Sequence, residues 1–292
     1  MTPQDRKHRG KRRRAAIRHA VFTRAPARLL GKRLAMGRPG EHFCVNNRTI
    51  ELPNLPDELC GLKITHFSDP HIGELITADH LPPMVETANS LGGDLIAVTG
   101  DFIDFSNKYL PAVVESMRRL EAPLGVWFVL GNHDYLDNAE EVKRAFHAAG
   151  LNLLVNEAVK LRHQERTIAV GGIDWADKPA VLSKLVRGTA DLMDKSDLSI
   201  MLAHHPHAFD ACRECGINLT LSGHTHGGQI MLGKSDGRLG KLGLGQFSVR
   251  YLRGLYAQGD CRLFVSSGIG SWFPFRIQCP AEITLLELQN TY

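Results

Sequence analysis

The sequence predicts an α/β fold in which two sheets pack together and a metal site lies at the ends of their strands. Between residues 60 and 225, apolar runs rich in β-branched residues alternate with helical segments, which is typical of βαβ units and a mostly parallel sheet. Beyond Gly228 the pattern changes to short, Gly-rich strands that close with residues 281–288. This change predicts a second, more antiparallel sheet packed on the first. Five of the runs also end in Asp, Asn or His, for which a core strand has no packing reason.

Turn and capping residues delimit the other elements. Residues 41–58 are expected to form an edge hairpin or linker, with Asn46 and Asn47 at its turn and Pro53 and Pro56 as breakers. Residues 151–172 indicate a hairpin that turns at residues 164–166. Three helices are predicted from capping residues and early prolines. The first is capped by Thr77, has Pro82-Pro83 in its first turns and ends near Gly92-Gly93. The second runs from Pro111 to Leu120 and the third from Asn138 to Ala149.

The polar strand ends form one constellation around Asp101, which follows the buried run 94–99 at the place where open α/β sheets hold their ligands. The other four runs end at Asp69-Pro70-His71, Gly131-Asn132-His133-Asp134, His204 and Gly223-His224-Thr225-His226. Carboxylate, imidazole and amide donors suit divalent metals such as Mn, Fe or Zn. Asp69 and His71, two apart in an extended turn, can point at one ion, and the two oxygens of Asp101 can bridge to a second.

In this order, the motifs Asp69-x-His71, Gly100-Asp101-x-x-Asp104, Gly131-Asn132-His133-Asp134, His204 and Gly223-His224-x-His226 resemble the full signature of the calcineurin-like metallophosphoesterases. The resemblance covers residues 60–290. Residues 223–230 and 268–282 are similar to the bacterial YaeI/YkuE branch, which includes phosphodiesterases and relatives of UDP-2,3-diacylglucosamine pyrophosphatases. The resemblance implies a four-layer αββα sandwich of two mixed sheets flanked by helices. The expected domains are a basic tail, residues 1–40, and a metallophosphoesterase domain, residues 41–292.

The resemblance also implies a role for each strand end. One ion would be held by Asp69, His71, Asp101 and His226, and the other by Asp101, Asn132, His204 and His224. His133 would be the general acid or transition-state donor, oriented by Asp104. The two ions would be divalent, with Mn favoured and Fe, Zn, Ni or Co as alternatives. Arg276 would help to hold the substrate phosphate, and the alternative is a surface arginine that pairs with Glu282.

Residues close to these motifs receive structural interpretations. Asp134 is expected to cap or hydrogen-bond its turn, and His66 to be a packed core histidine. His205 and His207, on either side of Pro206, are expected in an exposed loop. Pro70 stands where the family has an apolar residue with an N–H group, so it removes a backbone donor but no ligand. Cys212 and Cys215 have redox or zinc spacing and are expected to be ordinary cysteines at the end of a helix.

Charge is distributed unevenly along the 292 residues. The net charge is +4, but residues 1–40 carry 13 Lys and Arg against one Asp, or +12, so the remainder carries −8. An acidic body argues against a nucleic-acid groove on it. Six scattered cysteines and no secretory signal favour a reducing, cytoplasmic compartment. The tail, with fewer than the ~18 apolar residues of a spanning helix, is expected to bind the anionic inner face of the cell membrane. The alternatives are a disordered tail, a transit peptide or a nucleic-acid tether.

The leading functional hypothesis is a dinuclear-metal phosphodiesterase or pyrophosphatase. Its substrate would be a lipid-linked or nucleotide-linked phosphate ester such as UDP-2,3-diacylglucosamine. A second hypothesis is a soluble phosphodiesterase for small or cyclic nucleotides, in which the tail has no part. A third is a binding scaffold that keeps the metals without catalysis. His133 and Asp104 argue against the scaffold, because it would need no proton donor.

Overall fold

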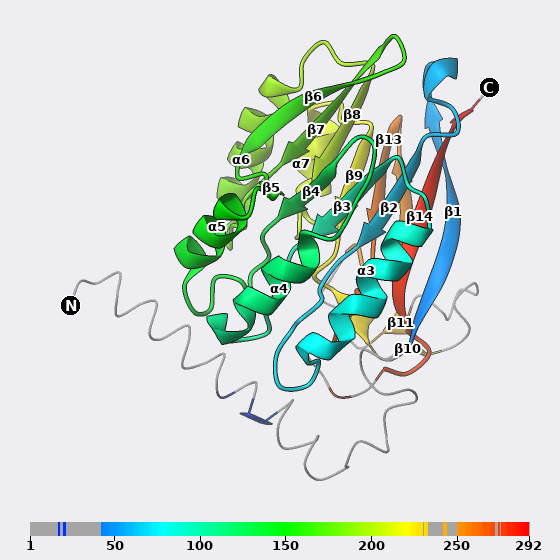
Figure 1. The fold of residues 1–292 in the computed structure, drawn as a ribbon. Coiled ribbons are helices and arrows are strands. Elements are labelled where there is room, and N and C mark those ends of the chain that lie inside the picture. The colour runs from blue at the N-terminus through cyan, green and yellow to red at the C-terminus, as the bar shows by residue number, and fades with distance from the viewer. Residues whose placement is uncertain are drawn as a thin grey trace.

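Two six-stranded sheets lie face to face, with helices against both outer faces, in the computed structural model (Figure 1). It describes residues 42–229, 250–271, 274 and 276–291, the backbone of 231–232 and 242–243, and the isolated positions Ile17, Ala20 and Val21. The expectations for the basic tail therefore fall on a segment that lies, apart from those three positions, outside the described residues. The layered arrangement confirms the predicted αββα sandwich.

The first sheet has the strand order β1-β14-β2-β3-β4-β5. Strands β2 to β5 run parallel, β14 is antiparallel to β2, and β1 is parallel to β14. The bounds are β1 Phe43–Pro53, β2 Lys63–Phe67, β3 Leu95–Thr99, β4 Val126–Val129, β5 Asn152–Leu153 and β14 Ala281–Thr291.

The second sheet has the order β12-β13-β9-β8-β7-β6. Its four central strands are parallel, and the two outer strands, β6 and β12, are antiparallel to their neighbours. The bounds are β6 Glu157–His163, β7 Arg166–Gly172, β8 Leu198–Leu202, β9 Leu219–Ser222, β12 Gly254–Gln258 and β13 Cys261–Val265. A short ribbon pairs β10 Met231–Leu232 with β11 Leu242–Gly243.

Helices α3 Leu81–Ser90, α4 Leu110–Met117 and α5 Ala139–Ala148 cover the first sheet, and α6 Pro179–Leu192 and α7 Ala208–Glu214 cover the second (Figure 1). The 3-10 turns are η2 Asp57–Leu59, η3 Ala78–His80, η4 Asn107–Tyr109 and η5 His226–Gly228. Asn138 caps α5 as predicted, because its Oδ1 accepts the N–H of Glu141 at 3.3 Å. Thr77 caps η3, which leads into α3, and α4 ends at Met117 rather than at the predicted Leu120.

Apolar side chains of both sheets fill the space between them, among them Ile64 and Leu95 of the first sheet and Ile200 of the second. His66 lies in this layer, as predicted for a core histidine. Its Nε2 is 3.0 Å from Thr99 Oγ1, and its ring meets Phe264 of β13 edge-on at 5.7 Å between centroids. Burial lowers the pKa of His66 to about 3, so the ring is neutral at pH 7.

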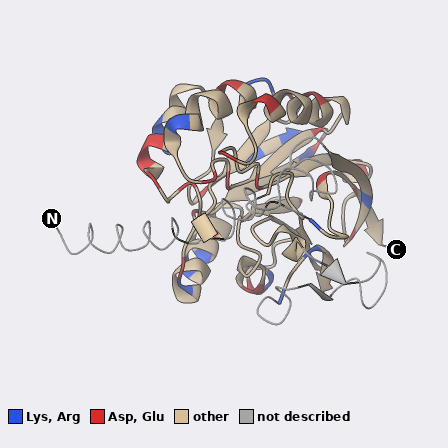
Figure 2. Ribbon diagram, turned by 90° about the horizontal axis from the view of Figure 1, so that it is seen from below, with Lys and Arg blue, Asp and Glu red and all other residues tan. Residues whose placement is uncertain are grey.

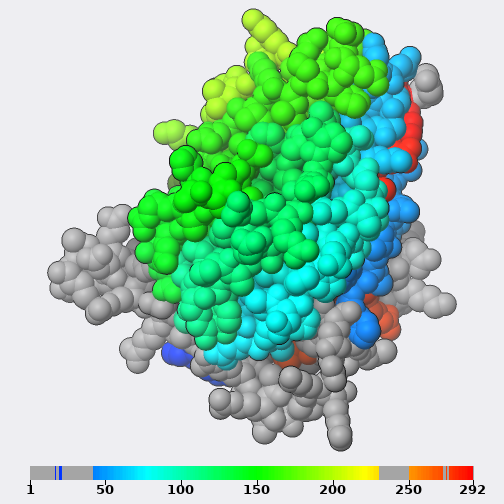
Figure 3. All heavy atoms as spheres, viewed as in Figure 1, coloured from blue at the N-terminus to red at the C-terminus, as the bar shows by residue number. Residues whose placement is uncertain are grey.

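The hairpin predicted for residues 41–58 is wrong. Asn46 and Asn47 lie inside the eleven-residue strand β1, which pairs with β14 along its whole length. The Asn46 amide donates to Glu282 Oε2 at 2.8 Å, so its partner comes from the other end of the domain rather than from a local turn. Strand β14 was expected in the second sheet, but it lies in the first, between β1 and β2. Figure 3 shows the two strands, blue and red, along one edge.

Acidic and basic positions are interspersed on the helices that cover the sheets (Figure 2). Among the described residues, no helix is both long and apolar enough to cross a membrane. Cys212, buried in α7, and Cys215, just after its end, are free thiols, as predicted.

Candidate metal centre

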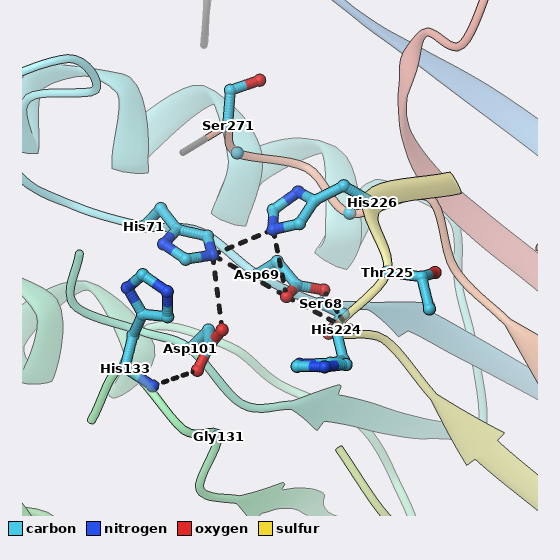
Figure 4. A network of polar contacts seen from close by, with 12 residues as sticks. Ser68, Asp69, His71, Asp101, Gly131, His133, His224, Thr225, His226 and Ser271 are labelled. Carbon is cyan, nitrogen blue, oxygen red and sulfur yellow. Dashed lines mark hydrogen bonds and ion pairs between the residues drawn. The ribbon is translucent and has the colours of Figure 1, made fainter. Parts of the chain in front are cut away.

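Five loops bring the predicted ligands to one edge of the two sheets (Figure 4). They follow β2, β3 and β4 of the first sheet and β8 and β9 of the second. Backbone hydrogen bonds join neighbouring loops, since Asp69 N donates to Gly100 O and His71 N to Asp101 O, both at 3.0 Å. The side chains that could hold a metal form three groups that share members: Asp69, His71 and His226; His71, Asp101 and His133; and Asp101, His204 and His224.

Five of the predicted ligands have a left-handed backbone conformation. The φ angles are 58° at Asp69, 49° at His71, 55° at Asp101, 71° at His224 and 50° at His226. This conformation costs a residue other than glycine about 1–3 kcal/mol, and it persists where the surrounding structure imposes it. Five of the eleven described non-glycine residues with positive φ are thus residues whose side chains converge, and the sequence carries no signal for it.

The first group surrounds the space between Asp69 and His71. Nε2 of His226 lies 3.4 Å from Asp69 Oδ1 and 3.0 Å from His71 Nε2. Two imidazole nitrogens bound to one ion at about 2.1 Å each can lie at most about 4.2 Å apart. The observed spacing satisfies that limit. The backbone N–H of His224 donates to both oxygens of Asp69, at 3.1 and 3.2 Å, and so fixes the carboxylate.

The third group and the predicted ligand Asn132 contain buried polar atoms that lack partners. His204 Nδ1 donates to the carbonyl oxygen of Thr99 at 2.7 Å, so Nε2 is the ring nitrogen that a metal ion could bind. That Nε2 lies 3.2 Å from Asp101 Oδ2, and within the described part of the chain it has no hydrogen-bond donor. The buried Oδ1 of Asn132 likewise has no hydrogen-bond partner among the described residues. Buried polar atoms without partners are rare in native structures. A divalent cation can bind an imidazole nitrogen, a carboxylate oxygen and an amide oxygen at the same time. These residues therefore fit a metal ion.

Asp101 belongs to the second and third groups and lies between His71 and His204. Its Oδ2 is 3.4 Å from His71 Nε2 and 3.2 Å from His204 Nε2, while its Oδ1 accepts the backbone N–H of His133 at 2.7 Å. Burial disfavours the charged carboxylate, but His204 and His133 hold the pKa of Asp101 well below its usual range. This is the placement that a carboxylate bridging two ions requires.

His133 lies beside this carboxylate, and 24% of its side chain is exposed. Its Nδ1 donates to the carbonyl oxygen of Asp104 at 2.6 Å and lies 3.5 Å from the Asp104 carboxylate. Its ring meets the edge of His71 at 4.5 Å between centroids. Because Nδ1 is engaged with Asp104, Nε2 is the atom that could donate a proton to a substrate.

Asp134 supports the loops rather than the ligand groups. Its carboxylate accepts the backbone N–H groups of Asp101, Ile103 and Gly131, which agrees with the turn role predicted for it. Gly131 is also needed for its size, because a Cβ there would lie 2.2 Å from Asp101 Oδ1. Only glycine lets the loop after β4 approach Asp101 so closely.

Arg276 is not the surface arginine of the alternative interpretation. Glu282 accepts from Asn46 and from the backbone N–H of Ser267 instead. The guanidinium donates to Ser271 Oγ and to the carbonyl oxygens of Gly268, Gly270 and Cys279, and its Nη2 lies 3.3 Å from Nδ1 of His226. Arg276 therefore holds the loop after β13 against a predicted ligand, and these bonds oppose a bidentate grip on a diphosphate.

His207 is exposed, as predicted, but His205 is not. The His205 ring stacks on the predicted ligand His224, with centroids 4.4 Å apart and planes at 31°. Burial and the neighbouring His224 lower the pKa of His205 to about 2, so it is uncharged at pH 7. Pro206 suggested an exposed loop, and no local pattern could reveal a contact made across two strand ends.

Oxygen and imidazole donors without thiolates, in adjoining groups at the ends of parallel strands, suit a pair of hard or borderline divalent ions. Such pairs clamp the oxygens of a phosphoryl group during displacement. The fold and the site thus place the protein in the class of metal-dependent phosphoesterases.

Comparison with known proteins specifies the family. Residues 62–228 match the calcineurin-like phosphoesterase family, and the chain belongs to it. The chain is 31% identical over 249 residues to the uncharacterized metallophosphoesterase YkuE of Bacillus subtilis, which covers 83% of this chain and 84% of that protein. It is 31% identical over 249 residues to an uncharacterized metallophosphoesterase of Campylobacter jejuni, covering 84% of this chain and 63% of the relative.

A third relative is a transmembrane protein with a metallophosphoesterase domain from Danio rerio. It is 30% identical over 261 residues, which cover 82% of this chain and 56% of that protein. The chain therefore spans most of YkuE but less than two thirds of the other two relatives. These matches confirm the resemblance to the YkuE branch and identify the chain as a phosphoester hydrolase.

Proposed function

We propose that the chain hydrolyses a phosphodiester or pyrophosphate bond with two divalent ions, of which Mn is the first candidate. The observation that carries the proposal is the position of Asp101 Oδ2, 3.4 Å from His71 Nε2 and 3.2 Å from His204 Nε2. Asp69, His71, Asp101 and His226 would hold one ion, and Asp101, Asn132, His204 and His224 the other. Two ions held there would supply an activated water and neutralise charge on the phosphoryl oxygens.

Residues of the chain would donate the proton to the leaving group and hold the proton donor in place. The His133 ring donates the proton on Nε2 to the leaving oxygen, while Nδ1 stays bonded to Asp104. The Asp104 carboxylate, 3.5 Å from Nδ1, helps to hold the ring in this orientation. Asp134 and Gly131 keep the loops after β3 and β4 in contact, so the donor and the bridging carboxylate keep their relative positions.

Arg276 contributes to phosphate binding in this proposal mainly through its charge and through the loop that it holds. Arg276→Ala should raise KM on a diphosphate substrate more than on a simple diester, whereas Arg276→Lys should keep part of the difference. An unchanged ratio of the two KM values would leave Arg276 with a structural role alone.

The substrate proposed first is a lipid-linked or nucleotide-linked ester such as UDP-2,3-diacylglucosamine, presented at an anionic membrane to which residues 1–40 bind. The +12 charge of that segment supports this choice. The second candidate is a soluble nucleotide phosphodiesterase, and the third a scaffold without activity. Asp104 beside His133 favours the enzymes over the scaffold, because a scaffold needs no oriented proton donor.

The test combines metal analysis with a substrate panel. The purified chain should hold two divalent ions, lose hydrolysis on chelation, and recover it best with Mn. Bis-p-nitrophenyl phosphate, a cyclic nucleotide and UDP-2,3-diacylglucosamine separate the candidate substrates. A chain that binds two ions and hydrolyses none of them would support the scaffold.

A further inference from the structure

A cavity of about 530 Å³ opens beside the metal centre, between the first turns of α6 and helix α7. Its volume falls within the range of about 300–1,000 Å³ that is usual for small-molecule sites. His224 forms part of its wall and also belongs to the group of Asp101 and His204. The cavity therefore reaches the edge of the proposed reaction site.

The cavity wall is apolar in part and carries acidic groups. Leu182 of α6 and Ala208 and Ala211 of α7 line it, together with Ala176 and Pro179. The ionisable groups other than histidine are Asp177, Asp210 and Glu214, and among the described lining residues there is no Lys or Arg. Asp210 pairs with Arg250 at 3.0 Å and Glu214 with Arg187 at 2.5 Å, and neither arginine lines the cavity. An anion in the cavity would meet carboxylates first, at an unfavourable electrostatic cost.

The loop that forms one wall is fixed to the loop of His133. Asp174, two residues before Ala176, accepts a hydrogen bond from the hydroxyl of Tyr135 and lies 3.4 Å from Lys143 Nζ. The Asp174 N–H donates to Asn156 Oδ1 at 3.0 Å. Tyr135 also packs against Trp175, with ring centroids 5.6 Å apart. The wall is thus held in place relative to the predicted proton donor, as a preformed site requires.

The position of the cavity indicates which part of a substrate it could take. Figure 4 shows His133 and His224 on opposite sides of Asp101. A leaving oxygen that receives a proton from His133 lies on the side of that histidine. The group that remains esterified to the phosphate would then extend past His224, where His205 presents a ring stacked on it.

We propose that this cavity binds the retained alcohol of a phosphodiester, and that this alcohol is uncharged or cationic rather than a second phosphate. The proposal rests on the proposed function, because it needs hydrolysis at the metal centre. The volume of about 530 Å³ accommodates a group the size of a nucleoside or an amino alcohol. The apolar part of the wall favours an uncharged group, and the carboxylates disfavour an anion.

The experiment compares four diesters with the same p-nitrophenol leaving group in the Mn-loaded, full-length protein. The retained groups are methyl, thymidine, choline and glycolate, the last with a free carboxylate. The value of kcat/KM should rise at least about tenfold from the methyl to the thymidine and choline esters, and fall for the glycolate ester. Equal values for the four esters, or a preference for the glycolate ester, would overturn the proposal.

Two variants test the location. Ser183→Trp places an indole in the cavity, and the matched Lys184→Trp places it on the neighbouring exposed position, which does not line the cavity. Ser183→Trp should bring the thymidine-to-methyl ratio close to one, and Lys184→Trp should keep it. Ala176→Leu, in the loop, serves as a second filling variant if Ser183→Trp does not fold. A ratio that survives the filling variant contradicts the location.

The outcomes separate the two proposals. If the metal-loaded protein hydrolyses neither the four diesters nor the diphosphate UDP-2,3-diacylglucosamine, the proposed function itself fails. If the methyl ester is hydrolysed and the retained group makes no difference, only the cavity proposal fails.

Discussion

The carboxylate of Asp134 accepts the backbone N–H of Asp101 at 3.0 Å. The same carboxylate accepts from Gly131 at 2.9 Å and from Ile103 at 3.2 Å, so one buried side chain joins the loops after β3 and β4. Burial and the negative charge of Asp101 raise the pKa of Asp134 to about 7. Its position thus governs where Asp101 lies, although Asp134 belongs to none of the three candidate metal groups.

Asp134→Ala should lower metal affinity by about 10–100-fold, the usual effect of losing a group that orients a ligand. Titration with Mn, followed by its electron paramagnetic resonance signal, measures this directly. Glu140→Ala, an exposed carboxylate a few residues later, is the control and should bind as the parent does. Unchanged affinity in Asp134→Ala would mean that the strand ends alone position Asp101.

Asp101→Asn should cost more metal and more turnover than a substitution at any other single ligand, because both proposed ligand sets include Asp101. The amide keeps one oxygen but loses the charge that two cations would share. Metal content per chain and kcat on bis-p-nitrophenyl phosphate are the two measurements. A variant that kept two ions and near-normal kcat would disprove the bridging position.

His133→Ala should keep its metal and lose turnover by about 10²–10⁴-fold, the usual contribution of general acid catalysis. The loss should be smaller with a p-nitrophenol leaving group, which departs without a proton, than with an alkyl alcohol. Asp104→Asn should give a milder defect of the same kind. Equal losses on both leaving groups would assign His133 to charge stabilisation alone.

The strand ends illustrate how far the sequence could predict the site. Asp69, Asp101 and His204 each follow a short apolar run, and this local pattern was enough to place them together. The left-handed backbone of His224 and the stacking of His205 on it have no local signature, because they arise only when β8 and β9 lie side by side. The turn predicted at Asn46 failed for a related reason, since the group that binds its amide, Glu282, is more than 200 residues away.

Acid should destabilise the fold through His66. Its pKa in the folded state, about 3, lies below the ordinary histidine value of 6.5. As the pH falls from about 6.5 to about 3, His66 binds a proton in the unfolded state but not in the folded state, so the free energy of unfolding decreases. The slope from this residue is at most about 1.4 kcal/mol per pH unit. Urea denaturation of the parent and of His66→Asn should show a shallower pH dependence in the variant. His147→Asn, at an exposed histidine, should follow the parent.

Residues 1–40 should attach the protein to anionic vesicles. Each basic residue near such a surface contributes roughly 1 kcal/mol, and the −8 charge of the remainder should be repelled. The full chain should sediment with anionic vesicles and be released by salt, since charges are screened beyond about 8 Å at physiological ionic strength. A chain that starts at Glu41 should stay in solution, and neutral vesicles are the control. Equal, salt-insensitive sedimentation of both chains would reject an electrostatic anchor.

The parallel pairing of β1 with β14 has a consequence for the order of folding. Strand β14 lies between β1 and β2, so β1 has no neighbour in the first sheet until β14 is in place. On a ribosome, β1 would emerge early and remain without its ladder until nearly all of the described chain had been synthesised. Contacts this distant in sequence form slowly. The loops after β2 and β3 could therefore be made and folded well before the edge of their own sheet is closed.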